Sequence, residues 1–217
     1  MERARTIWFA RHAERIDLVD PAWLKTAERS HDPCLTENGV IQARELGQRL
    51  RDEGIVHIFS SPFYRAIETA YKVAELLDIP VKIENGFSEF LSVDLFSEQP
   101  TLRPVSHMAK IFPRVDPTYI SQINPEYPES AEELNKRTRK TMRLLLRKFS
   151  GDFLVVSHGQ TLRDAIEELI QEKSKVLMTS CCLNKVVQEG EIWKWLLKAD
   201  ESFQSSPSGR NKHGVYI

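Results

Sequence analysis

The chain has 217 residues, of which 41% are hydrophobic and 28% charged. This length suits one large domain, and the composition is typical of a folded globular protein, which excludes the disordered and fibrous classes. The formal net charge is only −1, so no overall field would hold nucleic acid or an anionic membrane surface. We therefore expect neither partner, and any binding of anions must be local.

The cysteines and the N-terminal segment indicate the compartment. The three cysteines are an odd number, and the adjacent pair Cys181-Cys182 fits neither a disulfide framework nor zinc-ligand spacing. We expect reduced thiols. The first apolar run, residues 6–10, is too short for a signal peptide or a membrane-spanning helix. We therefore expect a cytoplasmic protein.

Short apolar runs alternate with amphipathic stretches along the chain. Buried strands are predicted at residues 6–10, 56–60, 81–83 and 153–157, with a closing hairpin at 183–187 and 192–197. Helices are predicted at 36–53, 61–77, 130–149 and 160–172. Ser61 is the expected N-cap of the second helix, and Ser130 with Glu133 forms a capping-box pattern for the third. The alternation predicts an α/β fold: a mainly parallel central sheet with helices on both faces.

Two regions depart from this regular pattern. Residues 86–128 lose periodicity and contain several prolines, which predicts a loop-rich insertion within a single domain spanning residues 1–200. Residues 201–217 are rich in serine, and we expect them to form a mobile tail.

Basic side chains follow three of the predicted strands. Arg11 and His12 follow the first strand, Arg65 comes just after the second, and His158 follows the fourth. The carboxyl ends of parallel strands meet at one edge of a sheet, where ligands bind. Clustered cations repel one another unless an anion lies between them, and phosphate fits best. No spacing of histidine or acidic residues suits a metal, so we expect neither a metal nor another cofactor.

Four motifs resemble those of the histidine phosphatase superfamily, which includes the phosphoglycerate mutases. Arg11-His12-Ala13-Glu14 resembles its Arg-His-Gly-Glu signature, and Val155–Gly159 resembles its second histidine motif. Residues 35–43 and 60–70 are similar to its Leu-Thr-x-x-Gly-x-x-Gln-Ala and Ser-Ser-Pro-x-x-Arg-Ala-x-x-Thr-Ala segments. The resemblance covers residues 6–172 and implies a phosphoglycerate mutase-like fold.

Further residues resemble one branch of this superfamily, the suppressor-of-T-cell-receptor-signalling proteins and ecdysteroid-phosphate phosphatases. These residues are Arg15, the Glu89-Phe90 pair and a stretch from Phe112 to Pro128. The resemblance implies a phosphate monoester hydrolase, with His12 as the attacking imidazole and Glu89 as the proton donor. The matched residues that would bind phosphate are Arg11, Arg15, Arg65 and His158.

These residue types suit the implied chemistry. A neutral imidazole such as that of His12 can attack phosphorus, and a phosphohistidine divides one difficult displacement into two easier ones. Guanidinium groups can supply the electrostatic stabilisation that magnesium supplies in kinases, so the reaction needs no metal. The pKa of Glu89 would have to be raised, which burial favours and nearby arginines oppose.

One position departs from the signature and leaves other functions open. Ala13 stands where the family has glycine, and its methyl group could narrow the pocket or shift the backbone of His12. Besides the phosphatase, two hypotheses remain. One is a mutase that returns the phosphoryl group to a sugar acid. The other is a catalytically degenerate module that binds phosphorylated ligands as a scaffold.

The substrate is less well defined by the sequence. The branch resemblance allows phosphotyrosine proteins, steroid phosphates or small phosphate esters, and it also allows a homodimer. Apolar residues in and near the insertion suggest an apolar outer wall of the pocket, which favours a hydrophobic or aromatic leaving group. These residues are Phe87, Phe90, Leu91, Phe96 and Tyr119.

Overall fold

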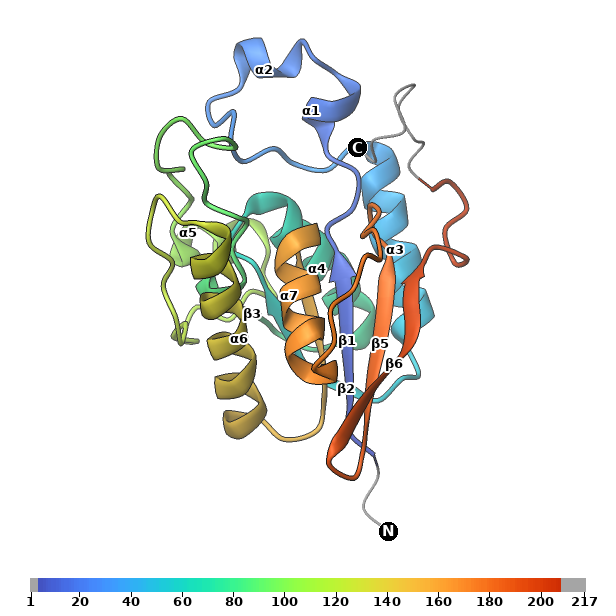
Figure 1. Cartoon of the computed structure of the whole chain (residues 1–217). Helices are drawn as coiled ribbons and strands as arrows, with labels where there is room; N and C mark the ends of the chain where they lie inside the picture. The colour runs from blue at the N-terminus through green and yellow to red at the C-terminus, as the bar shows by residue number, and fades with distance from the viewer. Residues whose placement is uncertain (1–3, 208–217) are drawn as a thin grey trace.

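The computed structural model describes residues 4–207 and confirms the expected α/β architecture (Figure 1). Within this range six strands form one sheet in the order β3-β2-β4-β1-β5-β6. The strands are β1 (Thr6–Arg11), β2 (Ile55–Ser60), β3 (Val81–Ile83), β4 (Asp152–Ser157), β5 (Leu183–Glu189) and β6 (Ile192–Asp200). The first four run parallel, and β5 and β6 form an antiparallel hairpin beside β1. The sheet is therefore mainly parallel, as predicted.

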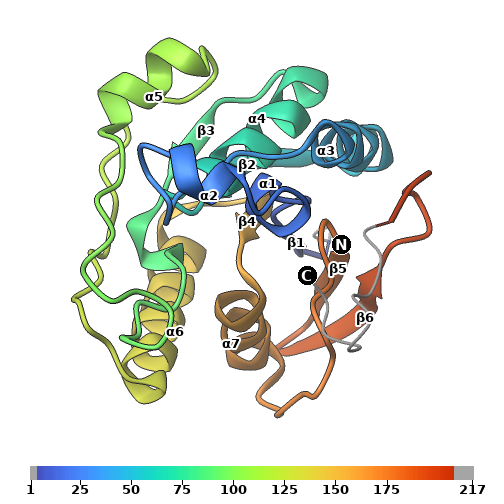
Figure 2. The ribbon, with the colours of Figure 1, turned by 90° about the horizontal axis from the view of Figure 1, so that it is seen from above.

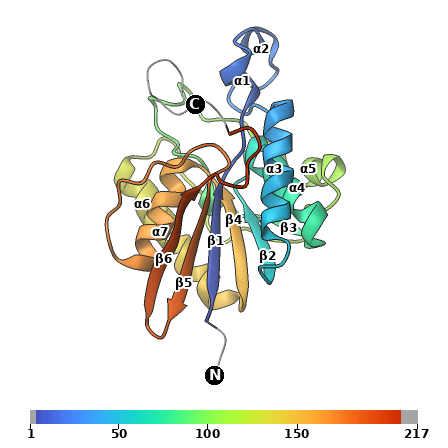
Figure 3. The ribbon, with the colours of Figure 1, turned by 90° about the vertical axis from the view of Figure 1, so that its right-hand side faces the viewer.

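Helices cover both faces of the sheet (Figure 3). Helices α3 (Glu37–Leu50) and α4 (Tyr64–Leu77) pack on one face, and α6 (Ala131–Lys148) and α7 (Gly159–Ile170) on the other. Successive strand side chains point to opposite faces, so Trp8 of β1 lies in the α3–α4 core and Phe9 in the α6–α7 core. Both faces of β1 are buried, which explains its unbroken apolar run. None of the described helices is long and apolar enough to cross a lipid bilayer.

The N-terminus of α4 differs from the prediction. This helix begins at Tyr64, because Phe63 has an extended backbone with φ −72° and ψ 139°. Ser61 is not its N-cap. Its hydroxyl oxygen lies 2.7 Å from Nε2 of His158, while the Tyr64 N–H donates to the carboxylate of Asp32 at 2.6 Å. The capping box of α6 is confirmed: Ser130 and Glu133 bond each other's backbone N–H.

Several short helices lie in the loops, where the sequence predicted none. Helices α1 (Ile16–Val19) and α2 (Trp23–Thr26) follow β1 and lie over the carboxyl edge of the sheet (Figure 2). The region 86–128 contains the end of a 3₁₀ turn, η1 (Asn85–Phe87), and helix α5 (Val105–Ile111). Met108 of α5 is buried, and Val105 and Ala109 pack against the same core. The helix has only 7 residues, which is too short for this apolar face to stand out as a helical period in the sequence.

The first part of the expected tail packs against the domain. Gln204 is buried and donates from its amide to the carbonyl of Ser180 at 3.2 Å. The carbonyl of Ser206 accepts bonds from the amides of Asn38 at 3.3 Å and Gln42 at 3.0 Å. Residues 208–217, the rest of that tail, lie outside the described residues.

Candidate active site

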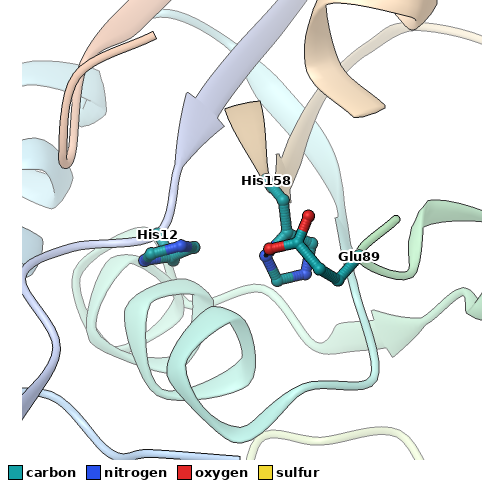
Figure 4. Close-up of side chains that lie close together, drawn as sticks. All are labelled: His12, Glu89 and His158. Carbon is teal, nitrogen blue, oxygen red and sulfur yellow. Dashed lines mark ion pairs between the residues drawn. The ribbon is translucent and has the colours of Figure 1, made fainter. Parts of the chain in front are cut away.

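The parallel strands bring the two motif histidines together. Arg11 is the last residue of β1 and pairs with Ser157, the last residue of β4. His12 and His158 therefore follow neighbouring strand ends, and their ring centroids lie 5.3 Å apart (Figure 4). Both rings are almost completely buried. The pairing of β1 with β4 thus brings two motifs that are far apart in the sequence into one site.

The imidazole of His12 is held with its Nε2 atom free. Its Nδ1 lies 2.9 Å from the carbonyl of Ala13, and because a carbonyl only accepts, Nδ1 carries the proton. Nε2 has no hydrogen-bond partner within residues 4–207. Burial lowers the pKa of His12 well below its usual value, and the charges of Arg65 and Arg11 lower it further. The ring is therefore neutral at physiological pH, with a lone pair on Nε2.

His158 and Glu89 form the opposite side of the site. Glu89 follows η1, and Figure 4 shows its carboxylate beside the His158 ring. Its Oε2 lies 3.1 Å from Nδ1 of His158 and 3.2 Å from Nη2 of Arg65. Nδ1 and Nη2 both donate to this oxygen, so Nε2 of His158 accepts from the Ser61 hydroxyl. Sequence reasoning missed this role of Ser61, because a serine before a proline at a helix start is typical of a cap.

The pKa values of Glu89 and His158 both lie below their usual values. Burial raises the pKa of Glu89, but the neighbouring His158 and Arg65 outweigh it and hold the pKa well below its usual value. Burial also lowers the pKa of His158 to about 4, despite the opposing charge of Glu89. In this structure Glu89 is thus a carboxylate that serves as the counter-ion of the cation cluster.

Arg65 and Arg11 bring buried positive charge to the same place. Arg65 is in the first turn of α4, and its guanidinium lies 4.6 Å from the centroid of the Phe63 ring. Its Nε and Nη1 have no partner among the described residues. Burial lowers its pKa to about 10, so it stays charged at neutral pH. Arg11 donates to the carbonyl of Met178 at 2.7 Å, and its Nε is likewise unpartnered within that range.

Arg15 lies near the cluster but has an acidic partner of its own. Its charge lowers the pKa of His12, which places it within electrostatic reach of that ring. Its Nε and Nη2 donate to the two carboxylate oxygens of Asp17 at 2.9 and 2.6 Å. The structure therefore gathers the six predicted residues within electrostatic reach of one another, and it holds Arg15 in a bidentate ion pair with Asp17.

Comparison with known proteins identifies the family of this chain. A model of the histidine phosphatase superfamily (branch 1) matches residues 7–201. The chain belongs to this superfamily.

The chain is similar to two curated proteins and to one solved structure. The ecdysteroid-phosphate phosphatase of Drosophila melanogaster is 25% identical over 237 residues, covering 88% of this chain and 31% of that protein. The transcription factor tau 55 kDa subunit of Saccharomyces cerevisiae is 31% identical over 171 residues, covering 71% and 38%. The ecdysone phosphate phosphatase of Bombyx mori, solved with tungstate, has a TM-score of 0.78 at 22% identity, covering 98% of this chain and 100% of that one.

These comparisons confirm the expected likeness to the ecdysteroid-phosphate phosphatase branch. The structural match, at 22% identity, shows the phosphoglycerate mutase-like fold. The chain spans only about a third of the length of these two curated relatives, 31% of the fly protein and 38% of the yeast protein.

The second family motif supports the loop that carries His12. The Thr36 N–H donates to the carbonyl of Glu14 at 3.0 Å, and the Glu14 N–H donates to the amide oxygen of Gln42 at 3.1 Å. A Cβ atom at Gly39 would lie 2.3 Å from that same Glu14 carbonyl. The glycine of this motif is therefore required by the close approach of the His12 loop to α3.

Ala13 fits this superfamily fold without visible strain. Its methyl group is fully buried in the α3–α4 core, and its N–H donates to the hydroxyl of Thr69 at 3.0 Å. Ala13 is not among the residues with positive φ, so its backbone conformation is open to any L-amino acid. The methyl group faces the core, which gives it no direct route to the phosphate.

The five apolar residues predicted for the pocket wall separate into groups. Phe87 is buried in the α6–α7 core, and Tyr119 packs against the same core while its hydroxyl donates to Glu84 at 2.6 Å. Both are therefore packing residues. Leu91 and Phe96 instead form a small cluster with Phe63, and Phe90 is half-buried. The Phe63 ring meets the His158 ring at a centroid distance of 5.2 Å, so this cluster adjoins the site.

The two histidines and Glu89 are also residue types that bind metal ions. Ligand atoms of His12, Glu89 and His158 all lie within 4.8 Å of one another. The charges of Arg11 and Arg65 act on this position, and they add to burial in lowering the pKa of His12. A divalent cation would be repelled there, whereas an oxyanion would be attracted.

Proposed function

We propose that this chain is a metal-independent phosphate monoester hydrolase that forms a phosphohistidine on His12. The observation that carries this proposal is the unpartnered Nε2 of a neutral His12 beside two arginines with free donors. A buried base with an available lone pair is suited to attack, and buried guanidinium groups are suited to hold an oxyanion.

In the first step, Nε2 of His12 attacks phosphorus. The N–P bond forms as the ester P–O bond breaks, and the leaving oxygen takes a proton from Glu89. In the second step, Glu89 as a carboxylate accepts a proton from water, which attacks phosphorus and releases phosphate from His12. Arg11, Arg65 and His158 stabilise the negative charge of the transferring oxygens throughout.

The protonation state of Glu89 changes when a phosphate ester binds. In the structure Arg65 and His158 keep its pKa low by contacting Oε2 directly. A phosphate group would compete for both contacts and add negative charge beside the carboxyl group. Burial then prevails, the pKa of Glu89 rises, and the residue becomes a proton donor.

The guanidinium groups take the place of a metal in this proposal. Arg65 retains two nitrogens without a partner in the described chain, and Arg11 retains one. These donors can contact the phosphate oxygens and neutralise their charge, which is the contribution that a metal makes in other phosphoryl-transfer enzymes.

The proposed substrate is a phosphate ester with a hydrophobic leaving group. The cluster of Phe63, Leu91 and Phe96 adjoins His158. A cavity of about 360 Å³ shares Phe63 and Leu91 with this cluster, and its lining combines the apolar Leu102 and Val105 with polar side chains such as Arg103 and Asn124. Apolar walls of this kind bind apolar groups. The relatives named ecdysteroid-phosphate phosphatase are consistent with this class.

Hydrolysis of p-nitrophenyl phosphate between pH 4 and 8 in the presence of a chelator tests the proposal. We expect turnover by the unmodified chain, a phosphorylated protein that is labile to acid and stable to base, and loss of both in His12→Ala. Hydrolysis that requires an added metal, or that persists in His12→Ala, would contradict it. A coupled assay with phosphoglycerate distinguishes the mutase, which would turn over far faster than it hydrolyses.

A second candidate is a phosphoresidue-binding module without turnover. The yeast relative carries the name of a transcription factor subunit, which favours a binding role for at least one similar protein. The same cations serve binding and transition-state stabilisation. Tight binding of tungstate with no hydrolysis of any ester would select this candidate.

A further inference from the structure

A buried ion pair lies behind the segment that carries Glu89. Arg137 is on α6, and Glu129 precedes that helix by two residues. Their side chains are 6% and 3% exposed, and two bonds join them: Nε to Oε2 at 2.9 Å and Nη2 to Oε1 at 2.5 Å. Burying two charges costs more free energy than their attraction returns unless further bonds are made. The pair makes those further bonds to one segment, Gly86–Leu91.

Arg137 holds the backbone before and at Glu89. Its Nη1 donates to the carbonyls of Gly86 at 2.9 Å and Ser88 at 3.3 Å, and its Nη2 donates to the carbonyl of Glu89 at 3.2 Å. Only a planar guanidinium offers donors in this arrangement, since a lysine has one nitrogen. The backbone of the predicted acid is thus bonded directly to α6.

Glu129 holds the backbone after Glu89. Its Oε1 accepts from the Leu91 N–H at 2.9 Å, and its own N–H donates to the Leu91 carbonyl at 2.9 Å. Because Oε1 also bonds to Arg137, one continuous set of bonds reaches from Gly86, three residues before Glu89, to Leu91, two residues after it.

Close packing of α6 limits movement of this segment further. A Cβ atom at Gly86 would lie 2.1 Å from the hydroxyl of Thr141, so the backbone lies directly on the helix. On the other side, the hydroxyl of Ser157 donates to the Phe87 carbonyl at 2.7 Å, and that of Thr161 to the Ser88 carbonyl at 2.9 Å. These contacts leave the Glu89 side chain as the part that can move.

We propose that Arg137 and Glu129 are positioning residues that hold Glu89 where it can protonate the leaving group. This inference rests on the proposed function, in which Glu89 is the acid. Neither residue contacts the phosphate-binding donors, so their removal leaves anion binding in place. A proton donor must lie within hydrogen-bond reach of its acceptor, so a small displacement of the backbone is costly only for reactions that need that proton.

The leaving group supplies a readout that a purely structural role would not change. p-Nitrophenolate departs without protonation, whereas the alkoxide of 2-phenylethyl phosphate requires a proton. The ratio kcat/KM covers only the steps up to departure of the leaving group, so dephosphorylation of His12 does not enter it. We therefore compare kcat/KM for the two esters in each variant, with tungstate affinity as a measure of the intact anion site.

Two variants release the segment in different ways. Arg137→Lys keeps a charge but cannot bond three carbonyls. The double variant Arg137→Met with Glu129→Leu removes both charges together, so neither charge is left buried without its partner. Arg139→Met is the matched control, because Arg139 lies on the same helix and pairs with Glu168. Glu89→Gln provides the full loss of the acid.

We expect the double variant to lower kcat/KM for 2-phenylethyl phosphate by about 30-fold or more, within the range that general acids contribute. Its kcat/KM for p-nitrophenyl phosphate and its tungstate affinity should stay within about threefold of the unmodified chain, and Arg139→Met should resemble that chain throughout. Arg137→Lys should fall between. Glu89→Gln should show the same selectivity with a larger loss.

The outcomes distinguish the positioning role of Arg137 and Glu129 from the acid role of Glu89. Equal losses on both esters, or no loss on either, in folded Arg137 variants would overturn the positioning role while Glu89→Gln still showed selectivity. If Glu89→Gln showed no selectivity between the esters, the proposed acid role would fail first, and the positioning role with it.

Discussion

The contact between Glu89 and the cation cluster predicts that removing its charge tightens anion binding. Ligand atoms of His12, Glu89 and His158 lie within 4.8 Å of one another, so an oxyanion touching both rings lies about as close to the Glu89 carboxylate. Two unit charges at this distance repel by about 3.5 kcal/mol at an effective dielectric constant of about 20. Relaxation and proton uptake reduce this value, so we expect Glu89→Gln to bind tungstate about 10- to 100-fold more tightly.

Calorimetric titration with tungstate at several pH values measures this effect. In the unmodified chain the pKa of Glu89 is low before binding and rises when the anion arrives, so binding takes up a proton and weakens as pH rises. Glu89→Gln cannot take up that proton and should show a flatter pH dependence. Comparison of two buffers with different ionisation enthalpies reports the number of protons directly.

A matched control excludes a general effect of charge. Glu68→Gln removes a carboxylate from α4, the helix that carries Arg65, at a residue that bonds the Leu35 N–H rather than the cluster. Its tungstate affinity should stay within about twofold of the unmodified chain. Weaker or unchanged binding by Glu89→Gln would refute the view that this carboxylate is the resident counter-ion of the site.

Three further predictions follow from individual contacts. Ala13→Gly removes a methyl group from the core, so it should lower the free energy of unfolding by about 1–2 kcal/mol with kcat/KM unchanged within about twofold; a large gain in activity would show that alanine obstructs the site. Asp32→Ala loses the carboxylate that bonds the Tyr64 N–H at the start of α4, the helix that carries Arg65, so it should weaken tungstate binding about tenfold. Asp32→Asn keeps an acceptor and should change tungstate binding little. Similar losses in the two variants would contradict this capping role. The pKa of His158 is lowered to about 4 in the fold, so the free energy of unfolding should decrease as pH falls from about 6.5 toward 4 in thermal denaturation, and decrease less in His158→Asn.

The main architecture and the cluster of basic residues could be read from the sequence for a physical reason. Strands buried on both faces give continuous apolar runs, and parallel strands place their carboxyl ends at one edge. Arg11, His12 and His158 lie at strand ends, so their proximity needs only the correct strand order. In the structure β1 lies beside β4, and Arg11 pairs with Ser157.

The contacts that support the site were not predictable in this way. Asp32 bonds Tyr64 from a loop that has no periodic pattern, and the donors of Arg137 reach carbonyls 48 to 51 residues away in sequence. Such bonds depend on the paths of loops in three dimensions, which local propensity does not determine. Ser61 was misassigned for the same reason: a serine before proline favours a cap locally, but His158, 97 residues later, takes its hydroxyl.

Residue type alone does not predict the charge state of Glu89. Burial and neighbouring cations act on its pKa in opposite directions, and only distances decide between them: Oε2 lies 3.2 Å from Arg65 and 3.1 Å from His158, so the cations prevail. The contact with Glu89 gives the buried Arg65 guanidinium a carboxylate partner at Nη2 alone when no phosphate is bound. A phosphate ester that takes over Arg65 would therefore remove the interaction that keeps Glu89 ionised, so that binding of the substrate itself prepares the acid.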